Sequence, residues 1–209
     1  MIQVMLVDDH AVVRMGFRML LNTAGIEVVA EAESGEQACR DYADAKPAAV
    51  VMDLSMPGMG GLEAVRRLLA HDAGARILAL SALEATSYAQ RVFKAGALGY
   101  LSKRGAPEAL IEAVRTVAAG RRYLDPQMGH RLAMAQIEGE SNPVDVLTER
   151  EFAVFLQLAQ GLSVVQIAEH LKLAASTVGT HLYNVKQKLH AANQAELTLV
   201  ALRWGLIQP

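Results

Sequence analysis

The chain has 209 residues, 52% of them hydrophobic and 20% charged, a composition that supports buried cores and excludes an intrinsically disordered protein. Lys and Arg number 20 and Asp and Glu number 22, so the chain as a whole is not a polybasic nucleic-acid binder. It has neither the pattern of a secretory signal nor an apolar stretch of membrane-spanning length, and we therefore expect a cytoplasmic protein with no membrane partner.

The first 120 residues alternate between strand-like and helix-like segments. Five runs are continuously aliphatic, as in parallel strands that are buried on both faces. The predicted strands are Ile2–Val7, Ile26–Ala32, Ala48–Met52, Arg76–Leu80 and Ala97–Leu101. Five strand–helix repeats of this length predict a doubly wound α/β domain over residues 1–120 with a five-stranded parallel sheet.

The segments between these strands carry apolar residues at three- and four-residue spacing, which is typical of amphipathic helices. The first such stripe is Val12, Met15 and Met19. Two further stripes consist of Leu62, Val65, Leu68 and Leu69, and of Ala109, Leu110, Ala113, Val114 and Val117.

Polar residues occupy the points where the strands end. Asp8 and Asp9 follow the first strand, Asp53 the third and Ser81 the fourth, and Lys103 lies near the end of the fifth. In doubly wound sheets ligands bind beyond the carboxyl ends of the strands, so we expect these side chains to share one crevice. Converging carboxylates repel one another unless a cation joins them, and Mg²⁺ prefers such oxygen ligands.

The chemistry of this set favours phosphoryl transfer. Asp53 would attack the phosphoryl group, the metal and Lys103 would neutralise its oxygens, and Ser81 would donate a hydrogen bond. The alternative is that acids at strand ends cap helices or form turns, and the Asp8–Asp9 pair could cap the first helix. Matches at four of the five strand ends are hard to attribute to capping alone. We expect His10 to start the first helix without a metal role.

A resemblance to a known family rests on four segments, VDDH, VVMDLSMPGMGGLE, LALSA and GALGYLSK. They resemble the receiver domain of two-component response regulators over residues 1–120. The resemblance implies a flavodoxin-like fold in which Asp53 accepts a phosphoryl group from a sensor histidine kinase. It also implies that Asp9 and Asp53 bind Mg²⁺ directly, Asp8 through water, and Ser55 through its backbone carbonyl.

The same resemblance assigns three residues to a switch. Ser81 matches the family's switch hydroxyl, Lys103 its phosphate-sensing lysine and Tyr100 its switch aromatic residue. The family more often has Thr at the first position, and often has Pro after the lysine, where Arg104 stands here. Phosphorylation would draw the hydroxyl and the lysine toward the phosphoryl oxygens, and the aromatic ring would follow inward.

Residues 121–146 are expected to form a linker. They include the segment EGESNP, whose Gly, Ser, Asn and Pro residues favour loops, and the boundary is placed near Asn142 and Pro143. Residues 147–209 then form a second, all-α domain.

Four helices are predicted in the second domain. Thr148 and Glu151 form a capping box at the start of the first, Gly161 ends it, and Ser163 caps the next. The remaining helices are Val164–Leu171, Ala175–Leu189 and Ala195–Leu206. Two short helices joined by a turn, the second with a polar outer face, predict a helix-turn-helix that places its second helix in the DNA major groove. The alternative is a small four-helix bundle that binds another protein.

A resemblance to a known family favours the helix-turn-helix over the protein-binding bundle. The segments LTEREFAVFLQLAQGLS, QIAEHL and STVGTHLYNVKQKL resemble the LuxR-type helix-turn-helix domain over roughly residues 147–207, and its fusion to a receiver defines the NarL/FixJ class of response regulators. That family usually has a lysine where Gly179 stands, and Asn-Lys-Glu where residues 164–166 are Val-Val-Gln. Because a groove-facing cation is missing, we expect a single copy to bind DNA weakly.

The exposed face of Ala175–Leu189 is expected to contact DNA. Thr180 and Tyr183, three residues apart, would reach into the groove together, unless the tyrosine ring is partly buried against the domain. Phosphate contacts are expected from Ser163, Ser176, Thr177, Asn184, Lys186 and Lys188. The last helix carries Leu197, Val200 and Ala201, which would form either a dimer seam or part of the domain core.

Together these features predict a transcription regulator that binds double-stranded promoter or operator DNA as a homodimer when Asp53 is phosphorylated. Dimeric binding is expected because two weak binders gain avidity on a palindromic site. One alternative is a regulator that acts through protein contacts without phosphorylation, which Gly179 favours. A second is a phosphatase or hydrolase with Asp53 as nucleophile, but the loops are too short for a substrate pocket. We therefore expect no enzyme beyond a receiver that assists its own phosphorylation and dephosphorylation.

Overall fold

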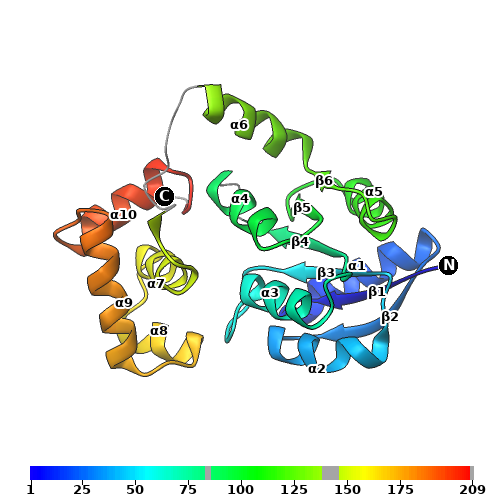
Figure 1. Cartoon of the computed structure of the whole chain (residues 1–209), viewed down its shortest axis with the longest axis horizontal. Coiled ribbons are helices and arrows are strands. Elements are labelled where there is room, and N and C mark those ends of the chain that lie inside the picture. The colour runs from blue at the N-terminus through cyan, green and yellow to red at the C-terminus, as the bar shows by residue number, and fades with distance from the viewer. Residues whose placement is uncertain (83–85, 138–145, 208–209) are drawn as a thin grey trace. The chain divides into compact units, whose positions relative to one another are not determined.

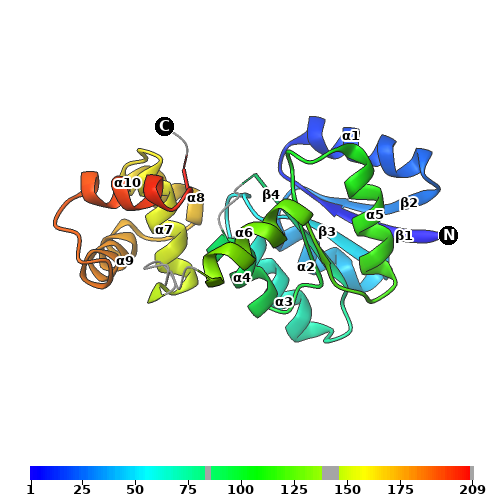
Figure 2. The same ribbon diagram turned by 90° about the horizontal axis from the view of Figure 1, so that it is seen from above.

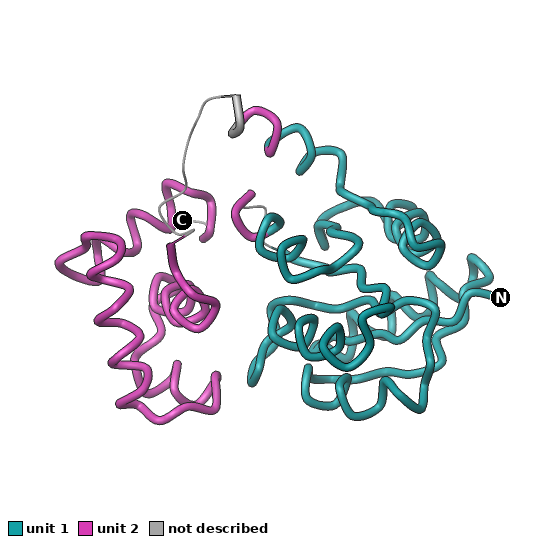
Figure 3. The backbone as a smooth tube through the Cα atoms, viewed as in Figure 1, with its two compact units in different colours: residues 1–82, 89–131 teal, residues 83–88, 132–209 magenta. Residues whose placement is uncertain are grey.

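The computed structural model describes residues 1–82, 86–137 and 146–207, which form two compact units (Figures 1 and 3). The first unit comprises residues 1–82 and 89–131, and the second comprises residues 83–88 and 132–209. No helix among the described residues is both long enough and apolar enough to cross a bilayer.

The first part of the chain alternates strands and helices. In chain order its elements are β1 (Ile2–Val7), α1 (Ala11–Thr23), β2 (Ile26–Ala32), α2 (Gly35–Ala45), β3 (Ala49–Asp53), α3 (Gly61–His71), β4 (Ile77–Ser81), α4 (Thr86–Lys94), β5 (Gly99–Ser102), α5 (Pro107–Ala118), β6 (Tyr123–Leu124) and α6 (Pro126–Ile137). The first two predicted strands match the observed bounds, and the next three are displaced toward the C-terminus by one or two residues.

All strand pairs are parallel, and the strand order is β2-β1-β3-β4-β5-β6. The chain therefore reverses its direction of winding at β1, which pairs with β2 on one side and β3 on the other. This confirms the doubly wound α/β architecture. Because the strands are parallel, their carboxyl ends share one edge of the sheet, and the polar residues that follow them are brought to that edge.

Both faces of the sheet are covered by helices (Figure 2). Side chains alternate between the faces of a strand. Val4 and Leu6 of β1 accordingly belong to a core cluster that includes Val114 and Val117 of α5 and Leu21 of α1. The helices α2 and α3 pack against each other and against β2 and β3, on the other side of the sheet.

The apolar stripe predicted in the first helix does not face the core. Val12 is 77% exposed, Met15 48% and Met19 63%, whereas Leu21 is buried and Phe17 packs against the core cluster. Helical spacing identified residues that share a face, but it did not decide which of two apolar faces meets the sheet. The stripes in α3 and α5 are buried as their spacing suggested at Leu62, Val65, Leu68, Leu110, Ala113, Val114 and Val117.

The segment expected to be a linker contains structure that the sequence analysis missed, and the sheet has six strands rather than five. The backbone N–H of Tyr123 donates to Leu98 at 3.0 Å and that of Asp125 donates to Tyr100 at 3.0 Å, which adds β6 beside β5. Asp125 then caps α6, since its Oδ1 accepts from the N–H of Gln127 at 2.9 Å. The Asp-Pro pair at residues 125–126 was a readable helix-start signal. The segment EGESNP and the expected boundary at Asn142 and Pro143 lie outside the described residues.

The remaining elements are helical, as predicted. They are α7 (Glu149–Ala159), α8 (Val164–Leu171), α9 (Ala175–Lys188) and α10 (Gln194–Arg203). Thr148 and Ser163 form complete capping boxes with Glu151 and Gln166, so the starts of α7 and α8 are fixed by reciprocal hydrogen bonds. The pair α8 and α9 has the layout of a helix-turn-helix.

Candidate functional site

The acidic residues predicted at the strand ends converge. Asp8 follows β1 and is 3% exposed, and Asp53 ends β3 and is fully buried. Carboxylate oxygens of Asp8, Asp9 and Asp53 and a ring nitrogen of His10 all lie within 4.8 Å of one another. The convergence of side chains predicted from parallel-sheet geometry is therefore present at the carboxyl edge of the first unit.

Lys103 supplies the positive charge of this cluster. Its Nζ lies 2.6 Å from Oδ2 of Asp8 and 2.9 Å from Oδ2 of Asp53. The backbone N–H of Lys103 donates to the carbonyl of Ser81 at 2.8 Å, which fixes the residue beside the end of β4. Burial acts to lower the pKa of Lys103, but the hydrogen bond to Asp8 and the charge of Asp53 outweigh burial, so the pKa is raised and the ammonium form is favoured.

Asp53 is held in a defined orientation. Its Oδ1 accepts a hydrogen bond from the backbone N–H of Ser55 at 3.0 Å, and its Oδ2 faces Lys103. Burial raises the pKa of Asp53, and the opposing effects of Lys103 and the Ser55 N–H only partly offset it. One oxygen is thus anchored by the backbone, while the other is next to the ammonium group of Lys103.

The loop after Asp53 bends back tightly over the strand end. The N–H of Gly61, at the start of α3, faces the carbonyl of Leu54 at 3.4 Å, and a Cβ atom at Gly61 would lie 2.0 Å from the carbonyl oxygen of Asp53. Any side chain at this position would force the helix away from the strand end. The glycines of the segment MPGMGG therefore allow α3 to begin directly against the acidic residue.

The donor set fits a divalent cation. Three carboxylates within a few ångströms of one another, with a single lysine between them, leave an excess of negative charge. Oδ1 of Asp9 is buried and, apart from the ring nitrogen of His10 at 3.0 Å, has no polar partner in the part of the chain that the structure describes. A hard cation with oxygen ligands would satisfy this oxygen and reduce the carboxylate repulsion.

An arginine that sequence reasoning missed holds the acidic loop in place. Nη1 of Arg14 in α1 donates to the backbone carbonyl of Asp8 at 2.6 Å, and its Nε donates to Glu31 of β2 at 3.0 Å. Arg18 contacts the same carboxylate at 2.9 Å. The sequence contained a partial signal, since Arg14 and Arg18 share a helix face, but the partner on β2 follows only from the fold.

The predicted switch residues lie in the same region. Ser81 ends β4 and Tyr100 lies in β5, and both side chains are fully buried. Asp53 pairs with Leu80 in the sheet register, so Ser81 lies one residue beyond it along the neighbouring strand. Their parts in a switch, and the binding of a metal by the carbonyl of Ser55, stay predictions.

In the second unit, α9 presents most of the residues predicted to contact DNA. Ser176, Thr177, Thr180 and Tyr183 are exposed, and Asn184 and Lys186 are half-buried. The Tyr183 side chain is 64% exposed, which argues against the alternative of a ring buried within the domain. The Thr180 hydroxyl donates to the carbonyl of Ser176 at 3.1 Å, so its methyl group is the part left for an apolar contact.

Two of the residues expected to contact phosphate have partners within the second unit, and their contacts with DNA stay predictions. Nζ of Lys188 lies 2.6 Å from Oε2 of buried Glu151, so its charge is already paired within the unit. The Ser163 side chain is engaged with Gln166 in the capping box of α8. Periodicity placed both residues on accessible helix positions, but it did not reveal these partners.

Of the two alternatives for α10, a dimer seam or the domain core, burial favours the core for two of the three residues. Leu197 and Ala201 of α10 are fully buried, and α10 packs against α7. They belong to the core of the helical unit and offer no surface to a second copy. Val200 is half-buried, and the exposed apolar residue of α10 is Leu199, which is 64% exposed.

Family comparisons agree with this division of the chain. Residues 4–115 match the model described as "Response regulator receiver domain", and residues 145–201 match "Bacterial regulatory proteins, luxR family". The first match ends within α5, and the second contains α7, α8 and α9.

Similar proteins cover the chain almost completely. It is 38% identical to the response regulator GacA of Pseudomonas viridiflava, over 99% of this chain and 98% of GacA. It is 40% identical to the response regulator UvrY of Escherichia coli K12, over 99% of this chain and 96% of UvrY. A solved structure of RcsB from Salmonella enterica serovar Typhimurium, bound to promoter P1flhDC in the presence of the phosphomimetic BeF3⁻, has a TM-score of 0.73 at 23% identity, over 97% of this chain and 98% of RcsB.

Proposed function

Because this chain belongs to the response regulators that join a receiver domain to a LuxR-type regulatory domain, we propose that it is a transcription regulator controlled by phosphorylation of Asp53. The observation that carries the proposal is the position of Asp53, a buried carboxylate at the end of β3 with Lys103 at 2.9 Å and two further acids beside it. A lone capping aspartate does not need this arrangement of charges.

In the proposed reaction, a carboxylate oxygen of Asp53 attacks the phosphorus of a phosphohistidine on a sensor kinase. A P–O bond forms and the P–N bond breaks, and the histidine of the kinase keeps the electron pair of that bond and takes up a proton. Mg²⁺, held directly by Asp9, Asp53 and the backbone carbonyl of Ser55 and through water by Asp8, would neutralise charge on the phosphoryl oxygens during the transfer. The receiver takes part once per phosphorylation event, so we propose no enzyme turnover on a diffusible substrate.

Lys103 links phosphorylation to the shape of the domain. Its ammonium group now contacts carboxylate oxygens of Asp8 and Asp53, and phosphoryl oxygens on Asp53 would offer it a stronger acceptor. The Ser81 hydroxyl would donate to another of these oxygens, and Tyr100 would adjust with it in β5. The resulting change at the α4–β5–α5 surface would promote homodimers that bind promoter or operator DNA through the exposed face of α9. Promoter DNA lies in the bacterial cytoplasm, where we expect the protein to act.

The proposal is tested by treating the full chain with acetyl phosphate and Mg²⁺. Intact-mass spectrometry should show one added phosphoryl group in the unmodified chain, and acid or base should remove it by hydrolysis. The control Asp44→Asn, which changes an exposed acid of α2, should carry the same adduct. Asp53→Asn should show no such adduct. An adduct that persists in Asp53→Asn would overturn the assignment.

The DNA step is tested by fluorescence anisotropy on genomic fragments that the phosphorylated protein selects. Acetyl phosphate should tighten binding for the unmodified chain and leave Asp53→Asn unchanged. Equal affinity with and without phosphorylation would instead support a regulator that acts independently of phosphorylation.

A further inference from the structure

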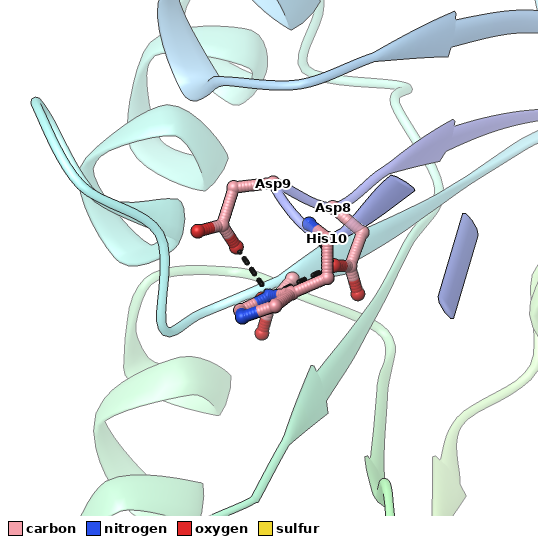
Figure 4. Close-up of side chains that lie close together, drawn as sticks. Asp8, Asp9 and His10 are labelled. Atoms are coloured by element: carbon pink, nitrogen blue, oxygen red, sulfur yellow. Dashed lines mark hydrogen bonds and ion pairs between the residues drawn. The ribbon is translucent and has the colours of Figure 1, made fainter. Parts of the chain in front are cut away.

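The strongest unassigned feature of the molecule is the imidazole of His10, which lies against the acidic cluster (Figure 4). Its Nδ1 lies 3.0 Å from Oδ1 of Asp9 and 3.5 Å from Oδ1 of Asp8. The ring is 66% exposed, so it is held in place by these neighbours rather than by apolar packing. Sequence reasoning gave this residue only the role of a helix start.

The distances match those between ligands of one metal ion. Two ligand atoms bound at about 2.1 Å lie about 3.0 Å apart at a right angle and about 3.4 Å apart at a tetrahedral angle. The two separations measured from Nδ1 of His10, 3.0 and 3.5 Å, have these values. The nitrogen and the three carboxylates could thus converge on one ion with only small movements, since all four ligand atoms lie within 4.8 Å of one another.

The backbone positions the ring for this role. His10 is the N-cap residue of α1, yet its side chain makes no capping hydrogen bond. Its backbone N–H donates to Oδ1 of Asp8 at 2.8 Å, and Arg14 fixes the carbonyl of Asp8, so the turn that carries both residues is anchored. A side chain that capped the helix would have been directed toward the N–H groups of α1. The imidazole is instead directed at a buried oxygen, Oδ1 of Asp9, for which its Nδ1 at 3.0 Å is the one polar partner among the described residues.

We propose that His10 is an additional protein ligand of the metal site, and that it shifts the preference of this site from Mg²⁺ toward Zn²⁺ and similar borderline cations. The inference rests on the proposed function, because it concerns the ion that assists Asp53. Carboxylates and water favour Mg²⁺, whereas a neutral imidazole nitrogen favours zinc, iron and nickel. A mixed set of three carboxylates and one imidazole therefore binds borderline cations more tightly than the same site without the ring.

The test is a pair of calorimetric titrations, with Zn²⁺ and with Mg²⁺, on the full chain and its variants. In His10→Ala the association constant for Zn²⁺ should fall at least about tenfold, which is the size of effect seen when groups that support a metal site are removed. The association constant for Mg²⁺ should change less than about threefold. His71→Ala is the matched control, because this exposed histidine is the last residue of α3 and the acidic cluster lies near the first. This variant should leave both association constants unchanged.

A second variant separates ligation from hydrogen bonding. His10→Gln keeps an N–H donor for Asp9 but is a poor ligand for Zn²⁺, so it should lose the zinc preference as His10→Ala does. Wild-type zinc affinity in His10→Gln, or an unchanged Zn²⁺-to-Mg²⁺ ratio in His10→Ala, would overturn the inference.

A spectroscopic measurement addresses the bond itself. In Co²⁺-loaded protein, a bound His10 ring gives an exchangeable, strongly shifted imidazole N–H proton signal that His10→Ala should lack, and its persistence in that variant would contradict the ligation. Failure here is distinguishable from failure of the proposed function. If Mg²⁺ binds and Asp53 is phosphorylated while the zinc preference does not depend on His10, only the ligand assignment is wrong.

Discussion

Nζ of Lys188 lies 2.6 Å from Oε2 of Glu151, so a single ion pair ties the last turn of α9 to the first turn of α7. Glu151 is almost fully buried, and its Oε2 also accepts the backbone N–H of Thr148 at 2.8 Å. The same carboxylate thus completes the capping box of α7 and holds the helix expected to contact DNA. Its two interactions couple the stability of the helix-turn-helix to one buried charge.

Breaking this pair should destabilise the helical unit. Glu151→Gln removes the charge that Lys188 and the capping box share, and we expect a loss of about 1–3 kcal/mol in the free energy of unfolding, measured by urea denaturation and circular dichroism. Lys186→Ala is the matched control, because Lys186 lies on the same helix but makes no ion pair with the described residues. A loss as large in the control would show that the effect is not specific to the pair.

The pair also sets a pH dependence. Burial acts to raise the pKa of Glu151, but the hydrogen bonds from Lys188 and Thr148 outweigh it, so the pKa is lowered from 4.5. A carboxyl with a lowered pKa stabilises the fold above its unfolded-state pKa, and that stabilisation is lost as the pH falls through the folded-state value. Acid titration of stability should therefore be steeper in the unmodified chain than in Glu151→Gln below about pH 4.5.

The contribution of Asp53 to the stability of the fold depends on pH in the opposite direction. Burial raises its pKa above 3.8 despite Lys103, so its contribution to stability is present below that pH and is lost as the pH rises through the folded-state pKa. Asp53→Asn stays neutral, and we expect its free energy of unfolding at pH 7 to be higher than that of the unmodified chain. Thermal unfolding without divalent cations measures the difference, which should shrink toward pH 3.5. A destabilised Asp53→Asn at neutral pH would contradict this account.

Gly179 offers a gain-of-function test of the DNA-binding face. It is exposed in α9, and a Cβ atom placed on it would have no heavy atom within 4 Å. Gly179→Lys should tighten DNA binding and steepen the dependence of log K on log salt by about 0.9, the effect of one added phosphate contact. Gly179→Ala separates helix stability from charge, since it should gain up to about 1 kcal/mol in stability with no change in the salt slope. Equal salt slopes for the two variants would show that this position of α9 does not contact DNA phosphates.

Substitutions of two leucines of α10 test which of them belongs to the domain core and which is available to a dimer interface. Leu197 is fully buried, so Leu197→Ala should cost about 2–5 kcal/mol in the free energy of unfolding. Leu199 is 64% exposed, and Leu199→Ala should change the stability of the monomer by less than about 0.5 kcal/mol. Urea denaturation, with sedimentation velocity to fix the oligomeric state, checks both. A small effect of Leu197→Ala on unfolding would restore that residue as a candidate for the dimer interface.

Much of the first unit could be predicted from local patterns. Continuous aliphatic runs located the five main strands, because parallel strands that are buried on both faces need apolar residues at every position. Parallel pairing then brings successive strand ends to one edge, so the positions of Asp8, Asp53 and Lys103 in the chain were enough to predict their meeting in space. In the second unit, capping residues and helical spacing located the four helices for the same local reason.

What the sequence by itself determined is therefore every described strand and helix except β6 and α6, and the edge of the sheet where the acidic residues gather. Both depend on local spacing and on the geometry of parallel strands. Only the tertiary structure decided which surfaces have partners. It turned the stripe of Val12, Met15 and Met19 outward, buried Leu197, and paired Lys188 with a carboxylate 37 residues away. Periodicity shows which residues share a face, but the partner of that face comes from distant parts of the chain.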